Sequence, residues 1–206
     1  MPDRARTPPS QLLFLPGASG DVHFWRALAR DLTHPAGRVF LDYPGFGDAA
    51  PAPHIDGMRA LLERVLERID RPTALIAQSM GGVLAIQAAL ARPELVTHLV
   101  LTATSGGIDM AALGARDWRP VFAAAKPNCP AWFLADRADL APDLGRIAAP
   151  TLLLWGDADP ISPLAVGRRL LAGLPHARLH VVAGGEHDLG QVHAARLAPL
   201  VDAHLS

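Results

Sequence analysis

Short, uninterrupted apolar runs recur along the chain and predict the strands of one sheet. The runs lie at residues 12–15, 39–41, 74–77, 99–103, 151–155 and 179–182. They do not alternate with polar residues, a pattern typical of strands that are covered on both faces. The runs therefore predict a mainly parallel sheet of about six strands.

Helical patterns lie between these runs. In residues 56–69, the apolar side chains fall on one stripe at three- and four-residue spacing, as in an amphipathic helix. Further helices are expected at residues 22–32, 83–91, 163–171 and 191–204. Because strands and helices alternate, we expect a three-layer α/β/α sandwich, with residues 1–105 and 150–206 forming its core.

One segment interrupts this alternation. Residues 106–149 contain no strand-like run but carry Trp118, Phe122, Trp132 and Phe133 among several prolines. One interpretation is an irregular helical excursion whose aromatic side chains form a small core of their own. The other is a short helical lid, with Trp118, Phe122 and Trp132 facing an apolar ligand. An exposed part of the segment could instead contact a second copy, so a monomer and a homodimer both stay open.

Composition narrows the possible functions. The chain has 206 residues, half of them hydrophobic, which suits one domain with a sizeable core. Its net charge of −1 at pH 7 offers no basic face for nucleic acid. A membrane-spanning helix needs about 18 consecutive apolar residues, and no stretch of this chain approaches that length. Residues 1–11 do not resemble a signal peptide. We therefore expect a cytoplasmic protein. Because Cys129 is the single cysteine, we expect no internal disulfide and no cysteine-based metal site.

The strongest chemical signal is a serine between the apolar run 74–77 and the predicted helix 83–91. A serine at such a turn projects its hydroxyl from the carboxyl edge of a sheet. The turn requires strained backbone angles, and the small residues Ala77 and Gly81 relieve the crowding around Ser79. This pattern is close to the Gly-x-Ser-x-Gly nucleophile elbow, with alanine in place of the first glycine. Similar glycine-rich turns also bind phosphate, and a serine there can simply cap a helix.

A serine hydroxyl needs a base and an orienting carboxylate before it can act as a nucleophile. Residues 156–160 follow the fifth predicted strand and contain Asp157 and Asp159. Residues 184–188 follow the sixth and contain His187. Both loops leave the sheet at the same edge as Ser79, and the order serine, acid, histidine is the one that this architecture uses.

Taken together, these motifs resemble those of α/β-hydrolase-fold enzymes, over nearly all of residues 12–205. The motifs are Leu15-Pro16-Gly17-Ala18 after the first strand, Asp42-Tyr43-Pro44-Gly45-Phe46-Gly47 after the second, Ala77-Gln78-Ser79-Met80-Gly81-Gly82, and the two loops described above. The resemblance implies that the first strand here corresponds to the third strand of the family, which leaves about six strands.

The resemblance also implies roles for individual residues. Ser79 is the expected nucleophile, His187 the base and Asp159 the acid, while Asp157 shapes its loop. Glu186 and Asp188 flank the histidine and could substitute if Asp159 points away.

The oxyanion hole is expected at the backbone amides of Ala18 and Met80. Pro16 occupies a position where many members of the family have histidine, which leaves Ser19 open as the first donor. His23 follows this loop and could touch the substrate or begin a helix. The other histidines lack a comparable loop, and most of them are expected at the surface or at helix caps.

The reaction implied by the resemblance is hydrolysis of a small-to-medium acyl ester through an acyl-enzyme, without a metal or a cofactor. The expected partner is thus a small-molecule acyl substrate. A serine at the elbow excludes the branches with an aspartate nucleophile, namely haloalkane dehalogenases and epoxide hydrolases. Thioesterases, carbon–carbon bond hydrolases, lactonases and amide hydrolases stay open. So do an acyltransferase, a perhydrolase and a low-turnover ligand-binding or receptor-like protein.

Overall fold

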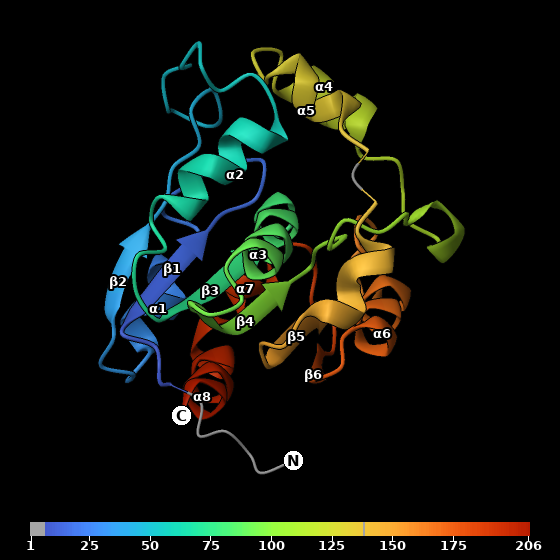
Figure 1. Ribbon diagram of the computed structural model, residues 1–206. Coiled ribbons are helices and arrows are strands. Elements are labelled where there is room, and N and C mark those ends of the chain that lie inside the picture. The colour runs from blue at the N-terminus through green and yellow to red at the C-terminus, as the bar shows by residue number, and fades with distance from the viewer. Residues whose placement is uncertain (1–6, 138) are drawn as a thin grey trace.

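The computed structural model describes residues 7–137 and 139–206. In this part of the chain six strands form one sheet, in the order β2-β1-β3-β4-β5-β6, and all neighbouring strands run parallel (Figure 1). The strands are β1 (Gln11–Leu15), β2 (Gly37–Phe40), β3 (Thr73–Gln78), β4 (Val96–Thr102), β5 (Thr151–Gly156) and β6 (Ala177–Val182). The predicted parallel sheet is confirmed.

Helices cover both faces of this sheet. The helices are α1 (Arg26–Asp31), α2 (Met58–Leu66), α3 (Met80–Ala91), α4 (Arg119–Ala125), α5 (Ala131–Ala135), α6 (Leu164–Gly173), α7 (Leu189–Val192) and α8 (Ala194–Leu205), with 3-10 turns at Ala111–Leu113 and Ala141–Arg146. Successive side chains of a strand point to opposite faces. In β1, Leu13 therefore joins the cluster under α2, α3 and α6, while Leu12 joins the cluster under α1 and α8. These two clusters make the predicted three layers.

The two edge strands depart from the prediction that every apolar run is covered on both faces. Most of β2 is exposed, including the Phe40 side chain at 39%, and β6 is only half-buried. The helices pack mainly over the central strands. Strands at the margin therefore keep contact with solvent, and their sequences also include Arg38, Arg178 and His180.

Several helix boundaries also differ from the prediction; the predicted helix 22–32, for example, begins only at Arg26. The predicted helix 83–91 begins earlier, at Met80, so that Gly81 and Gly82 lie inside α3. A larger residue would not fit at Gly82, because a Cβ atom at this position would lie 2.4 Å from the hydroxyl oxygen of Thr104. The predicted helix 191–204 is divided at His193 into α7 and α8.

The segment 106–149 contains α4, α5 and the two 3-10 turns, and its described residues include no strand. Figure 1 shows α4 and α5 beyond the arrowheads of the central strands, at the carboxyl edge of the sheet. The rings of Trp118, Phe122 and Phe133 contact one another, and Phe133 also contacts Phe46 at 5.4 Å between centroids. The segment thus has a small aromatic core that extends onto the loop after β2.

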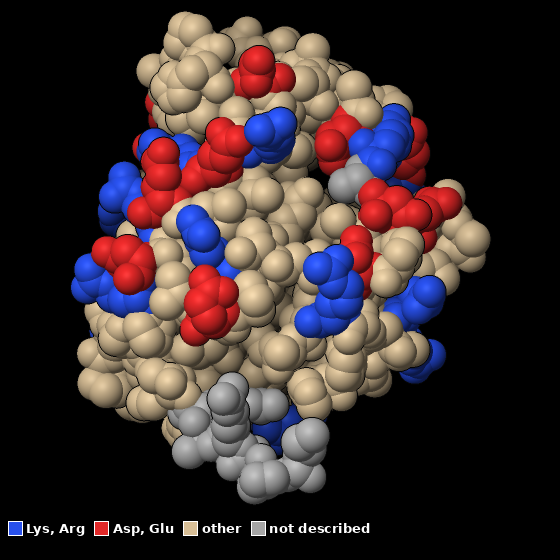
Figure 2. Space-filling model, viewed as in Figure 1, with Lys and Arg blue, Asp and Glu red and all other residues tan. Residues whose placement is uncertain are grey.

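Neither the distribution of surface charge nor the lengths of the helices indicates a particular kind of partner. On the described residues of the face shown in Figure 2, acidic and basic side chains are interspersed and form no extended patch of one sign. Across residues 7–137 and 139–206, the structure contains no helix with both the length and the hydropathy of a membrane span.

Candidate active site

The candidate site lies where the sheet changes its direction of growth. β1 and β3 are neighbours in the sheet, although β2 lies between them in the sequence. Parallel sheets bind ligands at the carboxyl edge beside such a switch point. Ala18 follows β1 here and Ser79 follows β3, so the topology brings the first motif and the serine turn together.

The serine turn has the strained geometry that its sequence predicts. Ser79 has φ 52° and ψ −119°, a region that residues other than glycine rarely adopt. A Cβ atom at Gly81 would lie 2.5 Å from the carbonyl oxygen of Pro16, and one at Gly17 would lie 3.1 Å from the Cβ of Ser79. The loop after β1 therefore packs directly against both sides of the serine turn.

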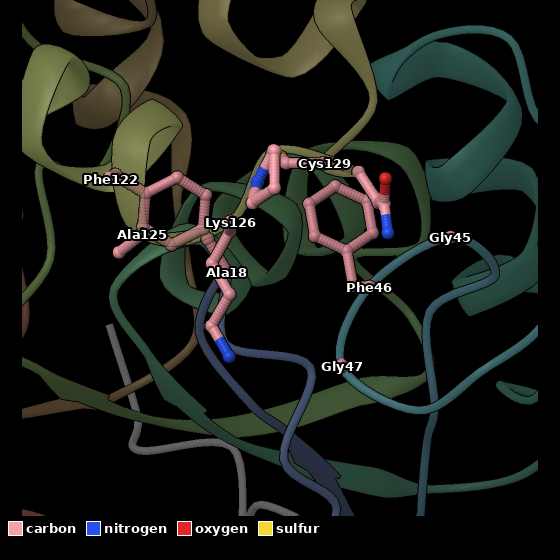
Figure 3. Close-up of a pocket in the computed structure, with 10 residues that line it drawn as sticks. Ala18, Gly45, Phe46, Gly47, Phe122, Ala125, Lys126 and Cys129 are labelled. Atoms are coloured by element: carbon pink, nitrogen blue, oxygen red, sulfur yellow. The ribbon is translucent and has the colours of Figure 1, made fainter.

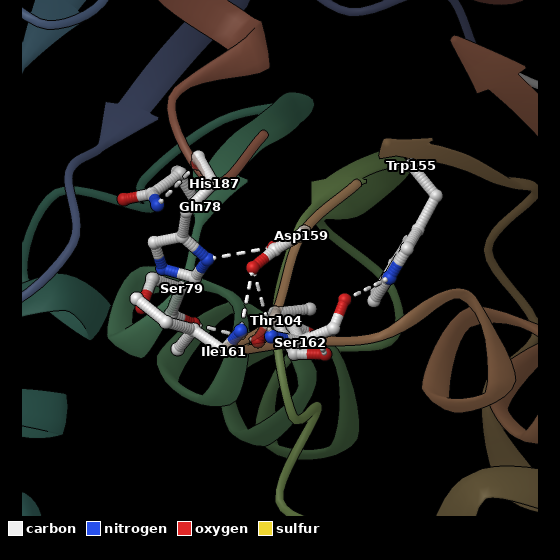
Figure 4. A network of polar contacts seen from close by, with 8 residues as sticks. All are labelled: Gln78, Ser79, Thr104, Trp155, Asp159, Ile161, Ser162 and His187. Atoms are coloured by element: carbon white, nitrogen blue, oxygen red, sulfur yellow. Dashed lines mark hydrogen bonds and ion pairs between the residues drawn. The ribbon is translucent and has the colours of Figure 1, made fainter. Parts of the chain in front are cut away.

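The histidine loop and the acid loop meet in a direct contact. Nδ1 of His187 lies 2.8 Å from Oδ2 of Asp159 (Figure 4). The Asp159 side chain is fully buried, whereas that of His187 is 23% exposed. The other carboxylate oxygen accepts hydrogen bonds from the backbone N–H groups of Ile161 and Ser162 at 2.8 and 3.1 Å. This leaves one oxygen directed at the imidazole and fixes its orientation.

Two hydroxyl groups connect the acid loop to the serine turn. The Thr104 hydroxyl donates to the carbonyl oxygen of Ser79 at 2.6 Å, and the Ser162 hydroxyl donates to the carbonyl oxygen of Thr104 at 3.1 Å. Both side chains are buried. Since Ser162 also donates its backbone N–H to Asp159, hydrogen bonds run without interruption from the serine turn to the acid.

The histidine loop is attached to both of its neighbours. The side-chain amide of Gln78, the residue before the serine, donates to the carbonyl oxygen of His187 at 3.2 Å. Asp157 accepts a hydrogen bond from the N–H of Gly184 at 2.6 Å. The expected loop-shaping role of Asp157 is consistent with this contact. Together with the contacts above, these bonds close a ring that holds the three loops in one relative position.

The serine hydroxyl is placed close to this pair without being bonded to it. Among the described residues, Ser79 Oγ makes no direct hydrogen bond to the His187 ring. Figure 4 shows the ring with one nitrogen bonded to Asp159 and the other on the side of Ser79. Ser79 is partly exposed, so a ligand can reach it. In hydrolases such a serine–histidine bond commonly tightens only in the complex with substrate.

Two backbone amides next to the serine have no protein partner. Neither Ala18 nor Met80 donates its N–H to another group in the described part of the chain. Met80 is buried, and buried N–H groups are nearly always paired. The alternative donor, Ser19, is exposed. Free amides at Ala18 and Met80 can therefore receive an oxygen of a bound ligand.

A cavity of about 250 Å³ opens beside Ala18 (Figure 3). Its other walls come from the loop after β2 and from the end of α4. The lining residues are Ala18, Gly45, Phe46, Gly47, Phe122, Ala125, Lys126, Pro127, Asn128 and Cys129. Burial raises the pKa of the Cys129 thiol, which disfavours the reactive thiolate and agrees with a structural role for this residue.

Of the four side chains expected to line a substrate pocket, only Phe122 lines this cavity. Trp118 instead stacks on Phe133 at 5.3 Å, and Trp132 packs against Phe46 at 5.6 Å. Neither tryptophan lines the cavity, but Trp118 contacts Phe122 and Trp132 contacts Phe46, and both of these phenylalanines do line it. His23 is exposed and does not line this cavity; it lies in the turn before α1, where its backbone N–H donates to Asp21.

The positions of the remaining titratable side chains settle two further alternatives. Glu186 and Asp188 are exposed and make no side-chain hydrogen bond or ion pair with His187, whereas Asp159 is in direct contact with its ring. His98 and His204 are exceptions to the expectation that most of the other histidines lie at the surface or at caps. Both are buried where α8, which carries His204, packs on β4, which carries His98, and their ring centroids are 5.3 Å apart.

Several residues that shape the site were not predicted from the sequence. Thr104 and Ser162 lie in loops after predicted strands, at the same edge as Ser79, and that position could have marked them. Gln78 was visible as part of the elbow motif. Phe46 was visible as part of the motif after the second strand, but nothing in the local pattern distinguished Lys126, because its place in the cavity depends on how distant segments pack.

The Thr104 hydroxyl is expected to stabilise the fold of the site. In a Thr104→Val variant the N–H of Gly106, which donates to this hydroxyl at 3.0 Å, loses its partner while the shape of the side chain is kept. A buried unpaired donor costs about 1–3 kcal/mol, so urea unfolding should show a free energy of unfolding lower by that amount. Thr104→Ser keeps the hydroxyl and serves as the control; an equal loss in both variants would contradict the hydrogen-bond explanation.

Comparison with known proteins agrees with this geometry. The sequence pattern of the alpha/beta hydrolase fold matches residues 11–129, and that of the TAP-like proteins matches residues 115–205. The 2-hydroxy-6-oxononadienedioate/2-hydroxy-6-oxononatrienedioate hydrolase of Cupriavidus pinatubonensis is 28% identical over 81% of this chain and 75% of its own length.

Two further proteins show the range of the similarity. The polyketide synthase ThaQ of Burkholderia thailandensis is 28% identical over 95% of this chain, but this chain spans only 12% of that protein. The crystal structure of a membrane phospholipase A, a bacterial virulence factor, superposes with a TM-score of 0.79 at 25% identity, over 96% of this chain and 78% of the other. With the sequence pattern matched over more than half of its residues, the chain belongs to the α/β-hydrolase family.

Proposed function

We propose that the protein is a serine hydrolase that cleaves small-to-medium acyl esters through an acyl-enzyme. The observation that carries this proposal is the buried Asp159–His187 pair, held by a ring of hydrogen bonds beside a serine with strained backbone angles. Strain of this kind persists only where the surrounding structure imposes it, and it is concentrated at functional sites.

The geometry supports a defined order of steps. Nε2 of His187 takes the proton of Ser79 as the serine oxygen attacks the ester carbonyl carbon, and Asp159 holds the proton on Nδ1 and stabilises the imidazolium. The N–H groups of Ala18 and Met80 donate to the oxyanion. His187 then protonates the departing alcohol as the carbon–oxygen bond breaks, which leaves the acyl group on Ser79. Water repeats the sequence and releases the acid.

Hydrolysis of a carbon–carbon bond is the second candidate. It is favoured by the relative that is named as a dienedioate hydrolase, which matches 81% of this chain. The same serine, histidine and amides would serve this reaction. Activity against a vinylogous 1,5-diketone that exceeds activity against every aryl ester in kcat/KM would favour this candidate. An acyl-coenzyme A assayed in parallel would identify a thioesterase.

Covalent labelling tests the proposed nucleophile. A serine-directed fluorophosphonate should add one label per molecule to the native protein, and none to a Ser79→Ala variant, as read by intact-protein mass spectrometry. Ser10→Ala removes an exposed hydroxyl remote from the site and should label like the native protein. Labelling of Ser79→Ala at the native rate, or no labelling of the native protein, would refute the assignment.

Turnover separates an enzyme from a ligand-binding protein with the same residues. A series of aryl esters of increasing acyl length should be hydrolysed with many turnovers per molecule. A single turnover that ends in a stable adduct would instead favour the receptor-like alternative, and transfer of the acyl group to an added alcohol would indicate an acyltransferase.

A further inference from the structure

Lys126 is an exposed residue that lines the cavity beside Ala18, next to the candidate site. It is the residue at which α4 ends, and it is the single lysine among the 206 residues. Its side chain lines the same cavity as Ala18. Figure 3 shows an extended chain that passes Ala18 in this view, with the ammonium nitrogen at its far end.

The charge of this cavity is unbalanced. No aspartate or glutamate is among the residues that line it. In the described part of the chain, Lys126 makes no ion pair and its ammonium group makes no hydrogen bond. The neighbouring Arg119, by contrast, has Asp117 at 3.7 Å. A bound molecule would therefore meet one positive group without a competing carboxylate.

The rest of the wall combines apolar side chains with polar groups. Phe46 and Phe122 contribute rings, Ala125 and Pro127 contribute aliphatic surface, and Asn128 adds an amide. A cavity with an apolar body and one ammonium group is complementary to a molecule that has an apolar body and one anionic end. Lysine acts there as a compact positive charge with three donors, and hydrogen bonds to an ionised acceptor are roughly twice as strong as neutral ones.

We propose that Lys126 binds a carboxylate of the substrate, so that the preferred substrates are esters with a second, ionised acid group. This proposal rests on the proposed function, because it concerns the substrate of the same site. Lys126 acts in it as a specificity-determining residue: it selects the acid-bearing substrate, while Ser79 and His187 carry out the reaction.

Paired substrates test this specificity. The 4-nitrophenyl half-esters of dicarboxylic acids are compared with the 4-nitrophenyl esters of the corresponding monocarboxylic acids. In Lys126→Gln the ratio of kcat/KM for charged over neutral ester should fall about tenfold, which is the expected loss of one charge-assisted hydrogen bond. Lys126→Arg should retain most of the ratio. Arg116→Gln, a charge removal outside the cavity lining, should leave it unchanged.

A second pair of substrates locates the carboxylate. Acyl esters of 4-hydroxybenzoate carry the charge on the leaving group and are compared with esters of 4-nitrophenol that have the same acyl chain. A Lys126-dependent preference in either pair supports the proposal and tells which side of the scissile bond enters the cavity. If neither ratio changes in Lys126→Gln, the proposal is wrong.

Cys129 provides a test that does not depend on hydrolysis. Its thiol lines the same cavity, so its alkylation by anionic iodoacetate is compared with alkylation by neutral iodoacetamide at one fixed pH. The ratio of the two rates cancels any change in the thiolate fraction. In Lys126→Gln this ratio should fall severalfold, whereas in Arg116→Gln it should not.

The two tests distinguish the failure of this proposal from that of the proposed function. A protein that hydrolyses no ester but whose iodoacetate preference depends on Lys126 refutes the function and keeps the anion site. A protein that hydrolyses neutral esters well, with rate ratios that do not respond to Lys126, keeps the function and refutes the anion site.

Discussion

Replacement of Asp159 by asparagine is expected to lower kcat for ester hydrolysis about 10⁴-fold while the protein remains folded. Oδ1 of the new side chain can still accept the hydrogen bonds from Ile161 and Ser162. The group that faces His187 then becomes an amide donor instead of a carboxylate. It forces the imidazole proton onto Nε2, where His187 can no longer take the proton of Ser79.

Asp157→Asn is the matched control for this variant. It makes the same chemical change in the same loop, and its Oδ1 can still accept the hydrogen bond from Gly184. We expect near-native kcat and a near-native urea midpoint. Comparable losses of kcat in the two variants, or a loss in Asp159→Asn that merely follows unfolding, would contradict the assignment of Asp159 as the orienting acid.

Replacement of Gly156 by alanine is expected to give the largest loss of stability. A Cβ atom there would lie 2.0 Å from the carbonyl oxygen of Gly185 and 2.9 Å from its Cα. Both contacts are with backbone, so neither can be relieved by a change of rotamer. The ends of β5 and β6 must separate, and with them the loops that carry Asp159 and His187. Overpacking typically costs 1–3 kcal/mol, and we expect roughly 3 kcal/mol here.

Gly145→Ala controls for the loss of a glycine. A Cβ atom at Gly145 meets no other atom within 4 Å, so the free energy of unfolding should stay within about 0.5 kcal/mol of the native value. Gly156→Ala should also reduce kcat under conditions in which it is folded, because the two loops no longer meet correctly. A stable and active Gly156→Ala protein would show that these loops can separate without consequence.

Local sequence patterns were sufficient to predict the architecture and to propose the candidate triad. Solid apolar runs are typical of strands that are covered on both faces, which holds here for the four central strands, and alternation with amphipathic stripes favours helices on the sheet. Ser79, Asp159 and His187 could be proposed as partners because each follows a strand, and all strands of a parallel sheet end at one edge. Gly81 marked the serine turn because a side chain there would collide with the loop after β1.

Contacts between distant segments could not be predicted in this way. The exposure of β2 and β6 depends on where the helices end over the sheet. The buried positions of His98 and His204 depend on how α8 docks. Periodicity describes one element at a time, so it contains no information on these interfaces.

The sequence by itself determined a parallel α/β sheet, the place of the serine turn, and the order of the three candidate catalytic groups, because these follow from local spacing and from parallel strands that end at a common edge. Only the tertiary structure decided that Thr104, Ser162 and Gln78 join the loops, that Trp118 and Trp132 stand behind the wall, and that Lys126 lies in the cavity beside Ala18. Those features arise where segments far apart in the chain pack together, and no local pattern specifies which side chains meet there.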